Sequence, residues 1–333
     1  MGNKVIELIT ESNLYENKAV LFYSAPKAKY IPILRKYNIR NLLLSYWYIR
    51  QKWSDFQKFV EYLREVDGVL MVDSGAHTFK SDTENRAHWR KPESYDSYIH
   101  EYVQFCYDYA PDIYCCVNID MDNLVGVEVV DKWNEKYFRP LNKITNVIFN
   151  VDSKYNRKGI IDHSGGLIRL KEYAKEFDYI GVNRKLANNY SNQVYKEAMI
   201  NKCKVHGFAV TSLAILRSSP FFSVDSTSWL MGDIFGVSYT YDGKNFKGWD
   251  KKQKYVRTQK KILAKTLDID HNLLKLDKTY QVTEFNLYAW KGFEKEYMNF
   301  ANLKLNTLSL KYYDKRIKED REVIPARKIK SKS

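Results

Sequence analysis

Short β-rich runs alternate with segments of helical periodicity along the first two thirds of this chain. Eight runs read as strands, over Ala19–Ser24, Asn41–Tyr48, Val69–Asp73, Asp112–Asp120, Ile144–Val151, Tyr179–Val182, Lys204–Val210 and Phe221–Asp225. The clearest helical face between them comprises Trp53, Phe56, Phe59, Val60, Leu63 and Val66, with Ser54 or Asp55 as its cap. Eight strands with intervening helical segments in roughly 210 residues predict an α/β fold, a (β/α)8 TIM barrel, rather than an open sheet.

The strand pattern fades after Asp225, so a second part of the chain is expected there. One loop and two helices are predicted, over Gly243–Asp250, Lys251–Leu267 and Glu284–Phe300 respectively. A charged tail follows from Lys311. We therefore expect a barrel over residues 1–232 and a C-terminal, mainly helical and basic extension over residues 233–333.

Positive charge is concentrated in that C-terminal part. The chain carries a formal net charge of +14, and residues 244–333 contain 23 Lys and Arg against 11 Asp and Glu, a net of +12. Such a surplus favours a polyanionic partner, with nucleic acid as the leading interpretation and a solubilising face as the alternative. Lys251, Lys252, Lys254 and Arg257 are the candidate contacts to a nucleic-acid backbone.

The four cysteines argue against a disulfide framework or a metal site. Cys115 and Cys116 are adjacent, and no pair has the Cys-x-x-Cys spacing of a zinc knuckle. A reducing, cytoplasmic location is therefore expected, with no metal. No apolar run reaches the ~18 residues that a membrane-spanning helix needs, so no membrane partner is expected.

Carboxylates follow three of the predicted strands. Asp73 ends the third strand, Asp120 the fourth and Asp225 the eighth. In a TIM barrel the ends of the strands share one rim, where the chemistry takes place, so these side chains can converge. Two carboxylates that flank one anomeric carbon are what glycosyl chemistry requires, because one attacks the carbon and the other handles a proton.

Two motifs around these carboxylates resemble those of a known family. VDSGAHTF, which contains Asp73, is similar to the Asp-Ser-Gly-Gly-Phe motif of tRNA-guanine transglycosylases, and FFSVDSTSW, which contains Asp225, is similar to their nucleophile strand. The pairing of HGFAVTS with FFSVDSTSW resembles most closely the phage branch of this superfamily, the 7-deazapurine DNA transglycosylases. The similarity covers about Val69 to Gly232.

The resemblance implies a fold, an activity and site residues. The family fold is a TIM barrel, and the implied reaction replaces guanine in nucleic acid with a free 7-deazaguanine base of the preQ0 or preQ1 type, without a cofactor. Asp225 matches the nucleophile and Asp73 the general acid and base. The positions implied to bind the base are Asp120, Gly181, Asn150, Ser74 and Gly207.

The chain departs from the family in ways that bear on its substrate. Ala76 replaces the second glycine of the motif, and His77 stands where an aromatic residue is expected. Bacterial tRNA-acting members carry a cysteine-rich zinc site after the nucleophile strand, whereas this chain has no cysteine after Cys203. DNA is therefore the expected partner, in host cytoplasm if the protein is phage-encoded. The alternatives are a tRNA-acting enzyme and a catalytically silent barrel that binds nucleic acid.

Three further features leave two interpretations open. Trp229 could stack on a flipped base or pack in the barrel, and His77 and His206 could contact substrate or be structural. The turn Ser164-Gly165-Gly166 could bind a phosphate at a helix N-terminus or simply start the helix.

Overall fold

The computed structural model of this chain is built around a closed barrel of eight parallel strands in sequential order. It describes residues 19–24, 27–82, 91–151, 166–219, 221–249, 261–262, 264–265, 272 and 280–305. The strands are β1 (Val20–Ser24), β2 (Asn41–Ser45), β3 (Val69–Asp73), β4 (Ile113–Val117), β5 (Asn146–Val151), β6 (Tyr179–Asn183), β7 (Lys204–Phe208) and β8 (Ser223–Ser226). The predicted (β/α)8 barrel is confirmed, because β1 pairs with both β2 and β8.

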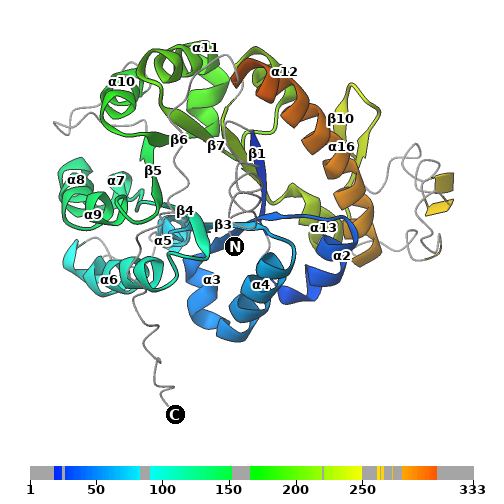
Figure 1. Ribbon diagram of the computed structural model, residues 1–333, viewed down its shortest axis with the longest axis horizontal. Coiled ribbons are helices and arrows are strands. Elements are labelled where there is room, and N and C mark those ends of the chain that lie inside the picture. Colours follow the sequence, from blue (N-terminus) through cyan, green and yellow to red (C-terminus); the bar gives the residue numbers. More distant parts are fainter. Residues whose placement is uncertain are drawn as a thin grey trace, which may run out of the picture.

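Helices surround the barrel, as Figure 1 shows. The longer ones are α4 (Trp53–Glu65), α6 (Glu93–Asp108), α10 (Leu167–Glu176), α11 (Arg184–Asn201) and α16 (Tyr280–Leu305). The shorter ones are α2 (Ile31–Lys36), α3 (Tyr46–Gln51), α5 (Ala76–Asp82), α7 (Asp122–Val125), α8 (Val127–Trp133), α9 (Arg139–Leu141), α12 (Leu213–Ser218) and α13 (Met231–Phe235). Three further short turns of helix are η2 (Ala28–Tyr30), the π-helical η5 (Asn134–Phe138) and η6 (Ser228–Leu230). One hydrophobic core joins the strands to these helices.

The second strand is shorter than predicted. We expected it to reach Tyr48, but β2 ends at Ser45 and α3 begins at Tyr46. The aromatic residues of this segment favour strand by propensity alone. Packing overrides that preference, because the buried Tyr46 ring contacts Tyr102 and Phe105 of α6 at 5.2 and 5.1 Å between centroids. The early end of β2 places Ser45, rather than Tyr48, on the rim of the barrel.

The cap predicted for the helix that follows is also different. The residue before α4 is Lys52, and no side chain caps this end. The Asp55 carboxylate instead accepts a hydrogen bond from the Ala28 amide at 3.0 Å. Asp55 therefore joins α4 to η2 instead of closing its own helix.

A β-hairpin lies where we expected the chain to lose its strand character. β9 (Ser238–Tyr241) and β10 (Phe246–Trp249) pair antiparallel, so the prediction of a loop over Gly243–Asp250 was wrong. Asp242 makes the turn, since its Oδ1 accepts from the amides of Lys244 and Asn245 at 2.9 and 2.7 Å. The two strands are only four residues long each, which is why the polar turn dominated the sequence pattern.

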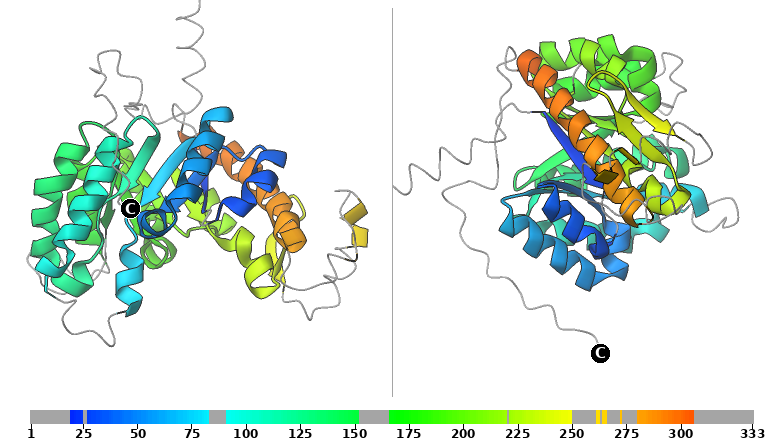
Figure 2. Two further views of the ribbon diagram at one scale, coloured as in Figure 1. Left: turned by 90° about the horizontal axis from the view of Figure 1, so that it is seen from below. Right: turned by 90° about the vertical axis from the view of Figure 1, so that its right-hand side faces the viewer.

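The predicted helix Glu284–Phe300 is present and longer, as α16. Leu287, Trp290, Phe293 and Tyr297 of α16 are at most 1% exposed and belong to the barrel's own core. The Tyr297 hydroxyl donates to the Phe221 carbonyl at 2.7 Å, and Tyr23 of β1 donates to Glu294 at 3.2 Å. Figure 2 shows α16 in orange beside the yellow hairpin. The helical part of the expected 233–333 extension thus covers the β1 and β8 side of the barrel.

Some predicted elements fall outside the described residues. Most of the helix predicted over Lys251–Leu267, and the whole tail from Lys311, lie there. Among the helices that the structure does describe, none has the combination of length and apolar character needed to cross a membrane.

We predict that the chain cut after Gly232 does not fold. Removing α16 exposes the large side chains it buries, which contribute on the order of 1.5–3 kcal/mol each. Their total is comparable with the whole stability of a domain, about 5–15 kcal/mol. The measurement is urea unfolding of residues 1–232, with residues 1–305 as the control that keeps α16. A cooperative transition in the shorter chain would show that α16 is dispensable for folding of the barrel.

Candidate active site

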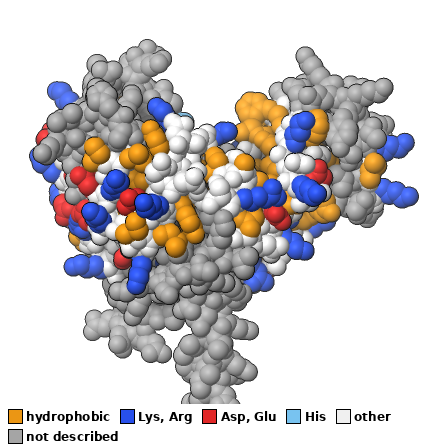
Figure 3. Space-filling model, turned by 90° about the horizontal axis from the view of Figure 1, so that it is seen from above, with side chains coloured by type: hydrophobic (Ala, Val, Ile, Leu, Met, Phe, Trp, Pro, Cys, Tyr) orange, Lys and Arg blue, Asp and Glu red, His pale blue; other side chains and the backbone are white. Residues whose placement is uncertain are grey.

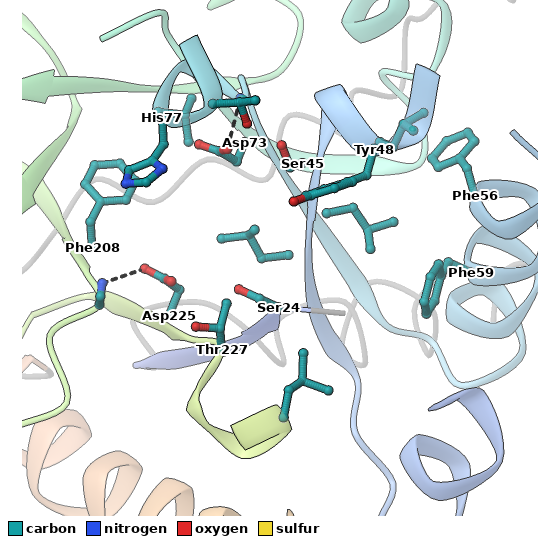
Figure 4. A pocket seen from close by; sticks show the side chains of 18 of the residues that line it. Ser24, Ser45, Tyr48, Phe56, Phe59, Asp73, His77, Phe208, Asp225 and Thr227 are labelled. Carbon is teal, nitrogen blue, oxygen red and sulfur yellow. Dashed lines mark hydrogen bonds between the residues drawn. The ribbon is translucent and has the colours of Figure 1, made fainter. Parts of the chain in front are cut away.

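The three strand-end carboxylates line one cavity. It has a volume of about 740 Å³, and its lining includes Asp73, Asp120 and Asp225. Asp73 ends β3, Asp120 follows β4 and Asp225 lies in β8, so the carboxyl ends of three strands supply them. Figure 4 shows Asp73 and Asp225 on facing walls of this space. The convergence expected from the sequence therefore exists.

Asp73 lies in surroundings that oppose its ionisation. Burial is the largest cause, the carboxylates of Asp120 and Asp225 add to it, and together they raise the pKa of Asp73 to about 6. The Gly75 amide, which donates to Asp73 Oδ2 at 2.9 Å, and the Ser45 hydroxyl act in the opposite direction. A carboxyl group with a pKa near 6 can give and take a proton at neutral pH.

Gly75 is required for this arrangement. Its φ of 77° is in the left-handed region, and a Cβ there would lie 2.8 Å from Trp47 Cβ and from the Tyr98 hydroxyl. The motif of Asp73 therefore needs its first glycine. At the second position of the family motif, Ala76 is 1% exposed and begins α5, which places the exposed His77 on the cavity wall.

Asp225 is contacted by one residue of β7 and by a residue just after that strand. Its Oδ1 accepts from the Ala209 amide at 2.9 Å and contacts His206 Nε2 at 3.2 Å. The Asp225 residue is 9% exposed, and its carboxylate faces the cavity (Figure 4). His206 and Ala209 therefore hold Asp225, and its carboxylate is directed into the cavity.

Asp120 is positioned by a buried ion pair just beyond it. Asp122 begins α7, and its carboxylate lies 2.8 Å from Arg169 of α10, with both side chains almost fully buried. Arg169 also contacts the Tyr173 hydroxyl at 2.5 Å. Because a buried ion pair is strongly geometry-dependent, it fixes the segment that carries Asp120. Nothing in the sequence pattern singled out Arg169, since an arginine on a helix is usually exposed.

Asn150 is the fourth predicted residue that lines the cavity. Its backbone amide donates a hydrogen bond to Asn118 Oδ1 at 2.9 Å, which orders the end of β5. Within the described residues, the buried Asn150 Oδ1 has no hydrogen-bond partner. A buried polar atom without a partner is costly, and this oxygen is closed off from the cavity, so Asn150 lines the cavity through its other atoms.

The other three residues predicted to bind the base do not line the cavity. Ser74 is fully buried beneath it, and its carbonyl accepts from the Tyr98 hydroxyl at 2.6 Å. A Cβ at Gly207 would lie 2.5 Å from the ring of Phe221, so this glycine makes room for an aromatic side chain. A Cβ at Gly181 would lie 2.3 Å from Phe208, and Phe208 does line the cavity. The base-binding roles of these three residues stay predictions.

The structure gives the positions of the aromatic and histidine residues whose roles were left open. Trp229 is fully buried, donates from Nε1 to the Ser24 carbonyl at 3.0 Å, and packs edge-on against Tyr30. Trp229 therefore belongs to the core, and the interpretation that it stacks on a flipped base is wrong. His77 lines the cavity, whereas His206 is buried behind Asp225. The first two residues of the turn Ser164-Gly165-Gly166 lie outside the described residues.

Several cavity residues were not predicted. Among the additional polar and aromatic side chains are Ser24, Ser45, Tyr48, Asn183, Phe208 and Thr227. Ser45 and Asn183 are the last residues of β2 and β6, so the strand-end rule would have found them had the strands been ended correctly. Tyr48, Phe56 and Phe59 form an apolar side of the cavity between α3 and α4 (Figure 4).

The predicted nucleic-acid contacts lie outside the described residues. This holds for Lys251, Lys252, Lys254 and Arg257. On the described surface seen in Figure 3, Lys and Arg side chains are scattered among polar and apolar groups. The predicted basic surface therefore stays a prediction.

We predict that Asp73→Asn stabilises the protein at alkaline pH. A carboxyl group whose pKa is raised by folding opposes the folded state once it ionises, and this penalty appears between about pH 4 and pH 7. The variant should gain at most about 3 kcal/mol in free energy of unfolding at pH 8, and only about 0.5 kcal/mol at pH 4. Urea unfolding at both pH values measures this.

Asp242→Asn is the control for that measurement. Hydrogen bonds from the Asn245 and Lys244 amides lower the pKa of Asp242, so its replacement should bring no gain at pH 8. An equal gain for Asp73→Asn at pH 4 and pH 8 would show that ionisation of Asp73 is not the cause.

Comparisons with known proteins identify no family for this chain, so its fold is established by its own strand pairing. No family model matches the chain, and no curated protein does. Among solved structures, it is similar to the catalytic domain of a β-amylase from Paenibacillus polymyxa, with 7% identity, a TM-score of 0.39, and 62% of this chain and 91% of that chain covered. It is also similar to native xylanase 10B from Thermotoga maritima, with 10% identity, a TM-score of 0.43, and coverages of 85% and 97%. Both are too distant to inform the activity.

Proposed function

We propose that this protein is a base-exchange transglycosylase that replaces guanine in nucleic acid with a 7-deazaguanine base. One observation carries the proposal: two carboxylates in different surroundings, Asp73 and Asp225, line the same cavity at the ends of β3 and β8. Two carboxylates with separate environments are the arrangement from which a nucleophile and a proton carrier are made. The motifs around both residues resemble those of guanine transglycosylases.

The first step forms a covalent intermediate. An Asp225 oxygen bonds to C1′ of the target nucleoside as the bond from C1′ to N9 breaks, and the electron pair of that bond stays on the base. Asp73 supplies the proton that the leaving guanine takes up, which its pKa of about 6 suits. The products are a glycosyl ester of Asp225, free guanine and an ionised Asp73.

The second step reverses the first with a different base. A 7-deazaguanine gives its N9 proton to the Asp73 carboxylate, and its N9 forms a bond to C1′. The ester bond breaks and returns the electron pair to Asp225. Two displacements at the same carbon retain its configuration, and both residues end as they began.

Asp120 is the proposed selector of guanine-like bases. An ionised carboxylate only accepts hydrogen bonds, so it suits the N1–H and the N2 amino group of guanine and disfavours adenine, whose N1 is an acceptor. Asn150, another residue of the cavity wall, is a second proposed contact to the base. Neither residue needs a metal for this role.

DNA is the proposed nucleic acid. The surplus of +12 over residues 244–333 supports a grip on a phosphate backbone, and the lack of cysteine after Cys203 separates the chain from zinc-containing tRNA enzymes. In duplex DNA the target must leave the base stack, at a cost of a few kcal/mol that backbone contacts can offset. A tRNA substrate would use the same chemistry, and mass spectrometry distinguishes the two.

The test supplies the full chain with DNA or tRNA and a 7-deazaguanine base, and identifies nucleosides by mass spectrometry after digestion. Modified deoxyguanosine is the expected product. Modified tRNA alone would overturn the choice of DNA, and no product from either would overturn the proposal.

We predict that Asp225→Asn abolishes exchange and leaves the fold and DNA binding intact. Removing a nucleophile costs several orders of magnitude, on the order of 10⁴ to 10⁶ in rate. Wild-type protein should also form an adduct with DNA that survives denaturation, and the variant should not. Asp242→Asn, a carboxylate in the exposed hairpin turn, is the matched control and should exchange normally. Near-normal exchange by Asp225→Asn would reassign the nucleophile.

We predict that Asp120→Ala weakens uptake of the free base far more than binding of DNA. The carboxylate accepts from the base and lies inside the cavity, so its loss should cost about 1.5–3 kcal/mol in base binding, a rise in KM for the base of roughly 10- to 150-fold. Steady-state exchange at varied concentrations of the free base measures base uptake, and a titration with DNA measures DNA binding. Equal losses in both would point to a structural role for Asp120.

A further inference from the structure

A buried chain of hydrogen bonds leads from β6 to the proposed nucleophile. The Tyr179 hydroxyl contacts Ser223 Oγ, Ser223 Oγ lies 2.7 Å from His206 Nδ1, and His206 Nε2 lies 3.2 Å from Asp225 Oδ1. His206 and Ser223 are fully buried, and Tyr179 is 4% exposed. Solvent therefore does not compete for these groups, and each must be satisfied by its neighbour.

The strand register produces this chain of contacts. His206 of β7 pairs with Ser223 of β8, and Asp225 is two residues further along β8, so Ser223 and Asp225 point to the same face. On the other side, Gly181 pairs with His206, and Tyr179 lies two residues before Gly181. The imidazole packs inside the barrel with the Phe208 ring at 4.6 Å between centroids. Its orientation is thus fixed by the sheet.

The contacts of the imidazole decide which nitrogen carries a proton. Asp225 as a carboxylate only accepts, so a bare Nε2 lone pair 3.2 Å away would oppose it. If Tyr179 donates to Ser223 and Ser223 donates to Nδ1, the proton of a neutral imidazole is placed on Nε2, facing Asp225. A doubly protonated imidazole also has a proton on Nε2. In either state His206 donates to Asp225.

A second donor reaches the same oxygen through a strained turn. The Ala209 amide donates to Asp225 Oδ1 at 2.9 Å, and Ala209 has φ 53°, in the left-handed region. A residue other than glycine in that region is costly, and such strain is found where a functional geometry requires it. The His206 imidazole and the Ala209 amide thus both act on Oδ1 of this carboxylate.

We propose that His206 is a positioning residue which, with the Ala209 amide, holds Oδ1 of Asp225 and leaves Oδ2 as the atom that bonds to C1′. Tyr179 and Ser223 keep the His206 proton on Nε2. The inference rests on the proposed function, since it names the attacking oxygen of that reaction. In the step itself the Oδ2–C1′ bond forms, the C1′–N9 bond breaks, and the proton for the base comes from Asp73, so His206 keeps its protons throughout.

The kinetic test is single-turnover release of guanine from DNA by the full chain. His206→Leu should slow release by ~10²-fold, the scale on which misplaced reacting groups lose rate, and leave the Kd for DNA unchanged. His206→Gln, which retains a donor and an acceptor, should recover to within about 10-fold of wild type. Tyr179→Phe and Ser223→Ala should each slow release, whereas Tyr114→Phe should not. Tyr114 is the matched control, a barrel tyrosine whose ring lies 6.4 Å from that of Phe22.

The outcomes separate a positioning role from a structural one. Wild-type rates in His206→Leu, or equal loss in the Leu and Gln variants with a lowered melting temperature and weaker DNA binding, would overturn the inference. If His206→Leu keeps full activity while Asp225→Asn is inactive, the inference fails and the proposed function stands. If wild-type protein releases no guanine from DNA or tRNA, the proposed function fails.

A second measurement needs no activity. Nitrogen-15 NMR of histidine-labelled protein, with the His206 signals assigned by His206→Gln, reports which ring nitrogens are protonated. We expect a protonated Nε2 whose signal shifts in Asp225→Asn and in Ser223→Ala. An unprotonated Nε2, or a signal indifferent to Asp225→Asn, would overturn the inference whatever the enzyme does.

Discussion

The repulsion between three carboxylates in one cavity is the constraint on which the rest of this site depends. Asp73, Asp120 and Asp225 come from different strands, and their charges oppose one another where water is partly excluded. A flexible chain would let them separate. The closed barrel prevents this, because each strand is hydrogen-bonded on both sides and β1 returns to β8. The stability of the closed barrel thus offsets the repulsion between these carboxylates.

The fold was predictable because the strands are buried and short. All eight were found, since each is a short, mostly buried run between helical patterns. The errors arose where tertiary contacts act against local preference. Tyr46 begins a helix because its ring is buried against α6. The hairpin that begins at Ser238 is stabilised by Phe246, which stacks on Tyr239 and meets Trp290 edge-on. Neither contact can be read from neighbours in the sequence.

The site was predictable to the extent that it follows the strand ends. Asp73, Asp120, Asn150 and Asp225 line the cavity because parallel strands bring their carboxyl ends to one rim. The glycines could not be interpreted from the sequence. Gly181 and Gly207 could equally expose an amide or leave room for a ring, and the structure places Phe208 and Phe221 against them. Arg169 was missed for a related reason, since its burial depends on Asp122 and Asp131 from other elements.

The donors around the two main carboxylates support different chemical roles, independently of any resemblance. Asp225 receives the Ala209 amide and faces His206, both on one oxygen, which orients the carboxylate and leaves the other oxygen toward the cavity. Asp73 receives the Gly75 amide, but burial and two neighbouring carboxylates outweigh it and raise its pKa. A nucleophile benefits from fixed orientation, and a proton carrier benefits from a pKa near neutrality. If the roles in the proposed reaction were exchanged, the carboxyl group with the raised pKa would have to attack the sugar, and the oriented one would have to exchange protons. The surroundings of both residues therefore favour Asp225 for the bond to carbon and Asp73 for the proton.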